Sequence, residues 1–160
     1  MSAHLHYSRL ASNVDDEDVA RSLKRAIFAI PSINGAALLE RMLPTLNIPP
    51  ETVVVLDQGS KDNTSAICAE FGVGIRQLNH PHTYTQCCNI ALEMATEAKA
   101  EFLFISNNDI LFSTDVAREL LFEMLSDEFL GIVSCSQLIV DENSDNKVLS
   151  NRVYWNLDKI

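Results

Sequence analysis

Short apolar runs alternate along the chain with segments that have helical composition or spacing. The runs are rich in β-branched or aromatic residues and end at turn formers, which is typical of strands buried on both faces. We expect strands at residues 26–30, 51–56, 73–78, 102–105, 130–135 and 137–140. We expect helices at residues 36–43, 65–71, 84–98 and 115–125. The alternation predicts a three-layer α/β/α domain with a mostly parallel sheet.

The segment at 84–98 places its apolar residues in steps of three and four, which defines one helix face. Cys87 and Cys88 belong to that face, so we interpret this vicinal pair as core packing rather than redox chemistry. The four cysteines show neither a C-x-x-C pair nor zinc-ligand spacing. We therefore expect reduced thiols and a cytoplasmic protein.

Composition and charge narrow the classes of partner. The 160 residues are 47% apolar and 21% charged, which is typical of a globular domain. The formal net charge of −10 argues against binding to nucleic acid or to anionic membranes, which requires a basic surface. A phosphate ligand stays compatible with this charge, because a metal ion can supply positive charge locally.

The termini and the domain layout follow from the same pattern. Residues 1–24 are polar and include an acidic cluster at 15–18, so we expect a flexible leader there. Residues 25–160 are expected to form a single domain. The sequence contains no apolar run of transmembrane length and its start does not resemble a signal peptide.

Polar side chains gather where three predicted strands end, at residues 31–35, 57–64 and 107–109. Ligands of open α/β sheets bind outside the carboxyl ends of the strands. The amides and the carboxylate of residues 107–109 are hard oxygen ligands of the kind that Mg²⁺ or Mn²⁺ prefers. An Asx-rich turn that caps the strand is the simpler interpretation of these three residues taken alone.

Several nucleotide and hydrolase motifs are absent. The first strand is not followed by G-x-G-x-x-G, and the chain contains neither G-x-x-x-x-G-K-[ST] nor G-x-S-x-G. The dinucleotide fingerprint, the P-loop and the serine-hydrolase elbow therefore receive no support.

Four segments together resemble the family 2 glycosyltransferases, which have the GT-A fold. Residues 31–35 (PSING) are similar to the family's P-x-Y-N-x loop, and residues 56–64 (LDQGSKDNT) to its V-D-D-G-S-x-D-x-T motif. Residues 84–92 resemble the helix motif G-F-x-x-x-R-N-x-G-L, with Asn89 at its centre. Residues 107–109 (NND) resemble a form of the D-x-D metal motif found in rhamnosyltransferase-like members. The segments occur in family order and cover about residues 25–140.

The resemblance implies a nucleotide-diphosphate sugar as donor and inverting transfer of the sugar to an acceptor hydroxyl. Asp57 would accept a hydrogen bond from the nucleotide base, and Asn108 would lie near the ribose or the sugar. Asp109 would bind Mg²⁺ or Mn²⁺ that bridges the diphosphate. The donor-binding residues that the resemblance implies are Pro31, Ser32, Ile33, Asn34, Asp57, Gly59, Ser60, Asn89, Asn107 and Asn108.

The chain departs from the family pattern at three positions. Ile33 stands where the first loop has an aromatic residue, and Gln58 stands at the second acidic position of the next motif. Cys88 occupies the basic position of the helix motif, for which Arg76 is a possible substitute.

The acceptor half of the family is not recognisable. The chain has no Q-x-x-R-W motif and no clear counterpart of the catalytic base, so no catalytic residue is predicted. Asp141, Glu142 and Asp145 are available carboxylates, although a solvated turn at 141–146 is the simpler interpretation. We expect the chain to stop before the acceptor half, and the acceptor could be a glycan, a lipid-linked molecule or a protein.

Two other classes of function stay open. One is a non-catalytic domain that binds the donor or a protein while keeping the GT-A fold. The other is a phosphoacceptor receiver domain with Asp57 at a strand end. A receiver needs an acidic pair directly after its first strand, whereas Pro31 and Ser32 follow that strand here.

Overall fold

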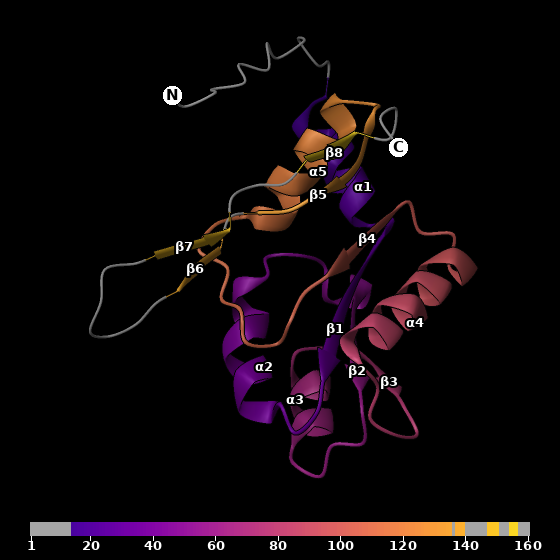
Figure 1. Ribbon diagram of the computed structural model, residues 1–160, viewed down its shortest axis with the longest axis vertical. Coiled ribbons are helices and arrows are strands. Elements are labelled where there is room, and N and C mark those ends of the chain that lie inside the picture. Colours follow the sequence, from indigo (N-terminus) through magenta and orange to yellow (C-terminus); the bar gives the residue numbers. More distant parts are fainter. Residues whose placement is uncertain (1–13, 136, 140–146, 151–153, 157–160) are drawn as a thin grey trace. The chain divides into compact units, whose positions relative to one another are not determined.

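A computed structural model describes residues 14–135, 137–139, 147–150 and 154–156 (Figure 1). The described residues fall into two compact units. One unit is Ala20–Glu119, and the other consists of the described residues before Ala20 and from Leu120 onward. The unit Ala20–Glu119 contains the regular alternation of strands and helices.

From Ala26 to Ile139 the elements follow the predicted order, whereas the helix at Asp16–Leu23 and the strands at Lys147–Ser150 and Tyr154–Asn156 were not predicted. The helices are α1 (Asp16–Leu23), α2 (Ala36–Met42), α3 (Thr64–Glu70), α4 (Tyr84–Glu97) and α5 (Val116–Ser126), with short 3₁₀ turns at Leu43–Thr45 and Pro50–Thr52. The strands are β1 (Ala26–Ser32), β2 (Val53–Asp57), β3 (Gly74–Gln77), β4 (Phe102–Ile105), β5 (Leu130–Val133), β6 (Gln137–Ile139), β7 (Lys147–Ser150) and β8 (Tyr154–Asn156).

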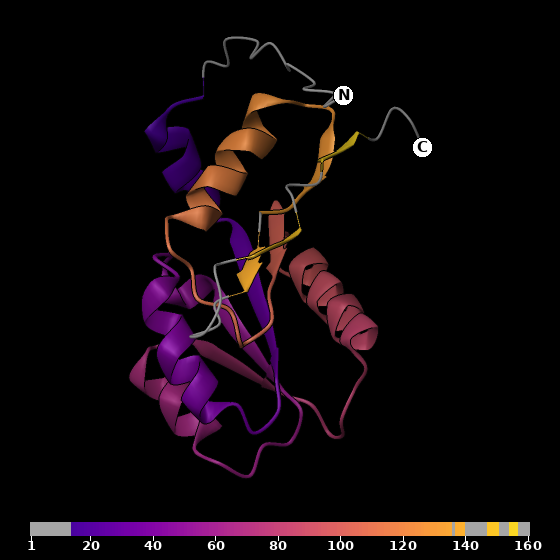
Figure 2. The ribbon, with the colours of Figure 1, turned by 60° about the vertical axis from the view of Figure 1, so that its left-hand side comes forward.

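Four strands form a parallel sheet in the order β3-β2-β1-β4. Helices α2 and α3 lie against one face of this sheet and α4 lies against the other (Figures 1 and 2). The alternation of side chains along the strands produces these two layers. Phe28 and Ile30 of β1 pack with Leu39 of α2, whereas Ala29 between them packs with Cys87 of α4. The predicted α/β/α architecture is therefore confirmed.

The apolar face predicted for the helix at residues 84–98 is confirmed at its centre. Cys87, Ala91 and Ala95 of α4 are buried, and Cys88 is half-buried. Cys68 and Cys87 are free thiols in the core. Burial raises the pKa of both, and the neighbouring Cys88 adds to the effect at Cys87. The interpretation of Cys87 as a packing residue is thus correct.

The strand at Leu130–Val133 pairs differently from the first four. β5 pairs with β8, and β6 pairs with β7, and both pairings are antiparallel. The sequence predicted β5 and β6 but not their partners β8 and β7. Strand pairing depends on residues far apart in the chain, which the local pattern does not show. Residues 141–146, where we expect a polar turn and three carboxylates, lie outside the described residues.

Helix α1 lies inside the range expected to be a leader. Its start is capped by Asp15, whose Oδ1 accepts hydrogen bonds from the backbone N–H groups of Glu17 and Asp18, both at 2.9 Å. Acidic residues in the first turn also suit the helix dipole. The acidic cluster therefore marks the start of a helix. An acidic cap followed by acidic residues in the first turn is a helix signal that can be read in the sequence. The layout of a leader at 1–24 and one domain at 25–160 stays a prediction.

Within the described part of the chain, no helix combines the length and the apolar character needed to cross a membrane.

Candidate functional site

Pro31 determines where β1 and β4 separate. Their pairing ends at Ala29 and Ile105, after which Ser106 N–H donates to Ala29 O at 3.2 Å. Residues of a strand alternate between their two neighbours, so Pro31 is the next to face β4, and proline has no N–H to donate. Pairing of β1 with β2 continues to Ser32 and Asp57. The polar residues after β4 therefore leave the sheet beside the end of β1.

Hydrogen bonds join the loops that follow all four strands of the sheet. We call residues 32–35, 57–63, 78–83 and 106–109 the rim. Ser32 Oγ accepts from Asn108 Nδ2 at 2.9 Å, and Ser32 O accepts from Gln58 N–H at 3.0 Å. Gln58 Oε1 in turn accepts from His82 N–H at 2.7 Å. The three sequence segments expected to form a site are thus brought together, with a fourth loop beside them.

Gly35 allows the first and fourth loops to approach. A Cβ atom at this position would overlap both Ser32 Oγ and Asn108 Nδ2. The buried Ser32 has little room to move away, because its side chain is 3% exposed. The link between the loop after β1 and the loop after β4 therefore depends on glycine at position 35.

Asp57 lies buried at the centre of the rim. Its side chain is 1% exposed, and its Oδ1 accepts from Ser60 N–H at 3.1 Å and from Ser60 Oγ. Ser60 Oγ also accepts from Asn34 N–H at 2.7 Å, while Asn34 Oδ1 accepts from Lys61 N–H at 2.8 Å. Asn34 has φ 49°, a left-handed conformation that asparagine tolerates. These bonds fix the carboxylate of Asp57 between the two loops.

Asp62 connects the starts of two helices. Its Oδ2 accepts from Ala36 N–H at 2.9 Å at the start of α2. Its Oδ1 accepts from Thr64 N–H at 3.1 Å and from Thr64 Oγ1 at 2.6 Å at the start of α3. The hydrogen bonds from Thr64 and then from Ala36 lower the pKa of the Asp62 carboxyl. Asn63 occupies the N-cap position of α3, but its side chain makes no capping bond.

Replacing Asp62 with asparagine should destabilise the fold by about 1 kcal/mol at neutral pH, because an amide keeps one acceptor and loses the other. Asn63→Ala is the matched control and should change little. Since the pKa of Asp62 is lowered on folding, its contribution is present above the unfolded pKa and is lost as the pH falls through the folded value. Urea unfolding should therefore show a smaller difference in the free energy of unfolding between the unchanged chain and Asp62→Asn at pH 3 than at pH 7. A difference that persists unchanged at pH 3 would contradict the role of the ionised carboxylate.

The residues of the NND segment differ in exposure. Asn107 and Asp109 are exposed, and Asn108 is half-buried through its bond to Ser32. Among the described residues no group of three or more His, Cys, Asp or Glu side chains could hold a metal ion. A single carboxylate with neighbouring amides still fits Mg²⁺ or Mn²⁺, since such ions take much of their coordination from water and from ligand phosphates.

Other predicted site residues stand apart from these contacts. Asn89 is exposed on α4, in the second turn of the helix, and is not among the residues that join the rim loops. Ile33 is 46% exposed in the loop after β1. Arg76 is exposed on β3, where it pairs with Leu56. Gly59 has φ 83°, and a Cβ atom at this position would meet no other atom within 4 Å, so its role in the rim is to allow the turn.

The sequence interpretation missed the fourth loop of the rim. Residues 79–82 are absent from the predicted site, although His82 N–H donates to Gln58 Oε1. The signal available in sequence is the capping box that follows. Thr83 Oγ1 accepts from Gln86 N–H, and Gln86 Oε1 accepts from Thr83 N–H at 2.8 Å. This box fixes the start of α4 and so the point at which the loop must end.

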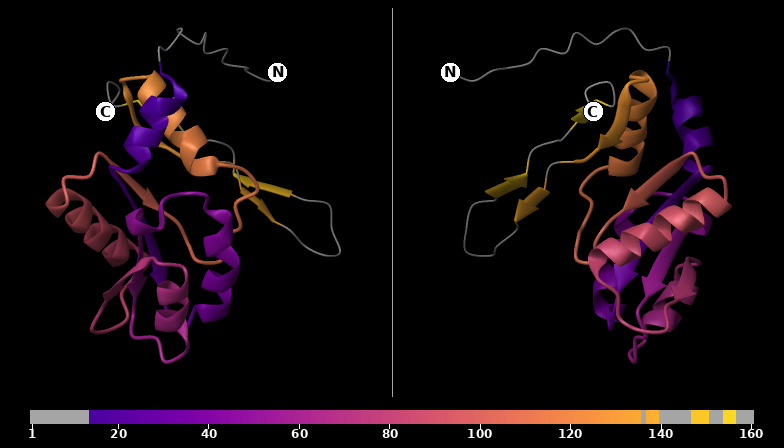
Figure 3. Two further views of the ribbon diagram at one scale, coloured as in Figure 1. Left: turned by 180° about the vertical axis from the view of Figure 1, so that it is seen from behind. Right: turned by 45° about the vertical axis from the view of Figure 1, so that its right-hand side comes forward.

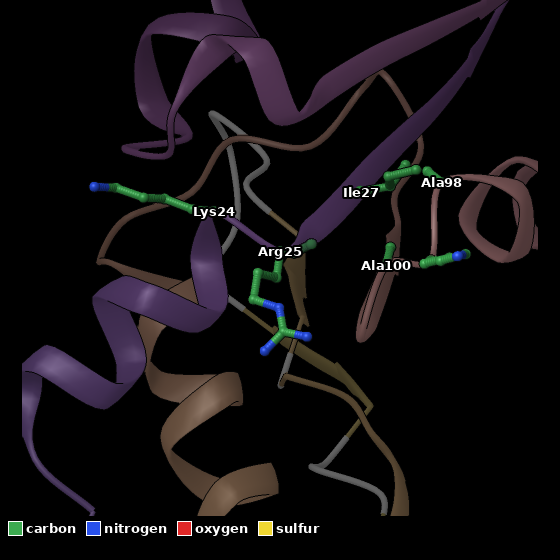
Figure 4. Close-up of a pocket in the computed structure, with 7 residues that line it drawn as sticks. Lys24, Arg25, Ile27, Ala98 and Ala100 are labelled. Atoms are coloured by element: carbon green, nitrogen blue, oxygen red, sulfur yellow. The ribbon is translucent and has the colours of Figure 1, made fainter.

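A depression lies at the opposite end of the sheet, at the amino ends of β1 and β4 (Figure 4). It is lined by Lys24, Arg25, Ala26, Ile27, Ala98, Lys99 and Ala100. The side chains of Lys24 and Arg25 extend in different directions (Figure 4). The guanidinium of Arg25 is paired with Glu101 at 2.6 Å. The basic groups do not converge, so the rim is the better candidate site.

The chain is similar to known proteins in sequence pattern and in fold. The model of the family described as "Glycosyl transferase family 2" matches residues 28–159. Among solved structures, glucosyl-3-phosphoglycerate synthase from Mycobacterium tuberculosis, in complex with uridine diphosphate, is similar with a TM-score of 0.52 and 14% identity. The similarity covers 73% of this chain and 46% of that one, so the chain spans about half the length of this protein.

A mycobacterial protein aligns with a TM-score of 0.46 and 14% identity, over 70% of this chain and 42% of that one, and this similarity adds nothing to the argument. No curated protein sequence matches the chain. The parallel sheet with helices on both faces is that of the GT-A glycosyltransferases. With the family match covering most of its length, the chain belongs to glycosyl transferase family 2.

Proposed function

We propose that the rim binds the nucleoside diphosphate of a nucleotide-sugar donor. The observation that carries this proposal is the set of hydrogen bonds that ties Ser32, Gln58, His82 and Asn108 into one polar edge above a buried carboxylate, Asp57. Uridine diphosphate in the similar mycobacterial synthase supports a ligand of this class.

The rim residues divide into those that contact the donor and those that position the loops. Asp57 accepts a hydrogen bond from the base, and Pro31, Ser32 and Ile33 line the base and ribose. Ser60 and Asn34 hold Asp57 and its loop through the bonds described above, so they act by positioning. Gly59 allows the turn between Asp57 and Ser60. Asn107, Asn108 and Asn89 complete the donor-binding set as predicted from the family pattern.

Asp109, with the amide oxygens beside it, would hold Mg²⁺ or Mn²⁺ against the diphosphate. Such an ion supplies charge that offsets the negative charge on the departing nucleoside diphosphate. Asn108 donates one amide N–H to Ser32, and its amide oxygen is the atom that could meet a cation.

The complete reaction is inverting transfer of the sugar to an acceptor hydroxyl. It needs a general base within hydrogen-bond reach of that hydroxyl, and it needs donor and acceptor held together. We assign the donor half of these tasks to this chain. The rest of the reaction is a proposal for the whole protein, since the chain spans less than half the length of the similar synthase.

A non-catalytic donor-binding domain is the second candidate. It is favoured by Ile33 and Cys88, which replace the aromatic and the basic residue of the family motifs. Both candidates predict nucleotide binding, whereas only the first predicts metal-dependent transfer or hydrolysis of a nucleotide-sugar.

Calorimetric titration of the 160-residue chain with UDP, GDP and dTDP, with and without Mn²⁺, tests the donor site directly. We expect binding of at least one nucleotide and a gain in affinity with Mn²⁺. Incubation with the corresponding nucleotide-sugars then separates the two candidates. Absence of binding to all three nucleotides would overturn the assignment of the rim as a donor site.

Asp109→Ala should abolish the gain in nucleotide affinity that Mn²⁺ provides, because the chain's carboxylate ligand is removed. Affinity measured without metal should change little, since Asp109 is exposed and outside the hydrogen bonds of the rim. Asp127→Ala is a suitable control for a change of one negative charge. A full Mn²⁺ effect in Asp109→Ala would place the metal elsewhere.

A further inference from the structure

Two histidines form an ordered aromatic pair in the fourth loop of the rim. The rings of His80 and His82 stack with their centroids 4.2 Å apart and their planes within 8°. His80 is exposed and His82 is half-buried. The loop connects β3 with α4 and lies at the same end of the sheet as the loops after β1 and β2 (Figure 3). The pair therefore presents a flat aromatic surface at the edge of the donor site.

Hydrogen bonds hold both rings in place. His82 Nδ1 donates to His80 O at 2.6 Å, and His80 Nδ1 donates to Pro81 O at 3.0 Å. A carbonyl oxygen can only accept, so the proton is on Nδ1 in each ring. The rings lose little further freedom when a ligand stacks on them, which favours binding.

Hydrogen bonds connect the loop of this pair to the loop of Asp57, the residue that we propose accepts a hydrogen bond from the nucleobase. Asp57 O accepts from Leu78 N–H at 2.8 Å, and the next residue, Gln58, accepts from His82 N–H through its side chain. Two hydrogen bonds thus join the histidine loop to Asp57 and Gln58. Any planar group bound against the Asp57 loop lies next to the loop that carries the imidazoles.

We propose that the stacked His80–His82 pair is the platform on which the nucleobase of the donor stacks. The inference rests on the proposed function of the rim. It also accounts for Ile33, an aliphatic residue in the loop after β1 that offers no ring for stacking. Histidine is one of the side chains on which bases stack. A base is a better match than the diphosphate, because two parallel rings present a π-face on which a planar group can stack.

Calorimetry with single and double alanine variants tests the platform. The nucleotide is the one that the unchanged chain binds best among UDP, GDP and dTDP, and inorganic pyrophosphate with Mn²⁺ reports on the diphosphate alone. We expect His80→Ala/His82→Ala to weaken nucleotide binding about tenfold, in line with the loss of one stacked base. Pyrophosphate binding should stay unchanged. His82→Phe should retain most of the affinity, because it keeps a ring and the backbone bond to Gln58.

The outcomes separate this inference from the proposed function. If the unchanged chain binds a nucleotide and the double alanine variant binds it equally well, the platform is wrong and the donor site stands. If the double alanine variant loses affinity for pyrophosphate as much as for the nucleotide, stacking is wrong and the histidines contact the phosphates. Stacking is also wrong if His82→Phe binds the nucleotide as weakly as the double alanine variant. If the unchanged chain binds no nucleotide, both proposals fail. Phe129→Ala removes another exposed ring and is the matched control.

A second measurement does not depend on the stability of the variants. In NMR spectra of the unchanged chain with saturating nucleotide, ring protons of His80 or His82 should show nuclear Overhauser effects to base protons. Their chemical shifts should also move through the ring current of the base. Contacts to ribose protons only, or none, would overturn the platform.

Discussion

Replacing Asp57 with alanine is expected to weaken binding of the nucleoside diphosphate by about tenfold or more, because a charge-assisted hydrogen bond contributes roughly 1.5–3 kcal/mol. Asp57 is 1% exposed, and Ser60 binds one of its oxygens, so the carboxylate is already oriented before a ligand arrives. Calorimetric titration of the variant beside the unchanged chain measures the effect.

Two controls make this result specific. Asp57→Asn keeps the shape of the side chain and one acceptor but loses the charge. Its affinity for the nucleoside diphosphate should therefore lie between that of the unchanged chain and that of Asp57→Ala. Glu70→Ala removes an exposed carboxylate from α3 and should leave binding unchanged. Truncation also leaves Ser60 without its partner and can lower stability. The thermal midpoint of each variant is therefore measured first, and binding is then compared at a temperature where every variant is folded. Unchanged affinity in a folded Asp57→Ala protein would place the base elsewhere.

The largest expected loss of stability is at Leu39, where truncation to alanine should cost about 3 kcal/mol. Leu39 of α2 is 0% exposed and packs with Phe28 and Ile30 of β1. Removing its side chain takes apolar contacts away and leaves a cavity between the helix and the sheet. Chemical denaturation in urea, followed by far-UV circular dichroism, measures the change in the free energy of unfolding.

The adjacent residue on the same helix is the matched control. Leu38 has the same side chain but is 39% exposed, so Leu38→Ala should cost well under half as much. Both substitutions change the helix propensity equally, so the difference between them reports burial alone. Similar losses for the two variants would mean that α2 does not pack on the sheet through the face containing Leu39.

The order of strands and helices was predictable because it depends on local pattern. The run at residues 51–56 is dense in β-branched residues, and β2 spans Val53–Asp57. The predicted helix face from residue 84 corresponds to α4, where Cys87, Ala91 and Ala95 are buried. Three segments of the candidate site were predictable for a related reason, since polar residues that follow parallel strands must emerge at one edge of the sheet.

The sequence pattern was ambiguous where a local signal has two interpretations. The acidic residues at 15–18 suit a solvated tail, and they equally suit the first turn of a helix. The structure has helix α1 there, with Val19 buried at 1% exposure. The strand at Leu130–Val133 was predicted, but its antiparallel partner β8 was not, because pairing depends on residues far apart in sequence.

The fold class, the order of the elements from β1 to β6 and the family resemblance could be predicted because hydrophobic period, turn residues and short motifs are local properties of the chain. Which of the polar residues meet could be seen only in the folded molecule. The bonds from Asn108 to Ser32 and from His82 to Gln58 join residues that are 76 and 24 positions apart. Such contacts depend on strand order and register, as when Pro31 ends the pairing of β1 with β4 and Gly35 leaves room for Asn108. The stacked histidines are close together in sequence, but the position of their loop beside Asp57 and Gln58 comes from packing of the loops.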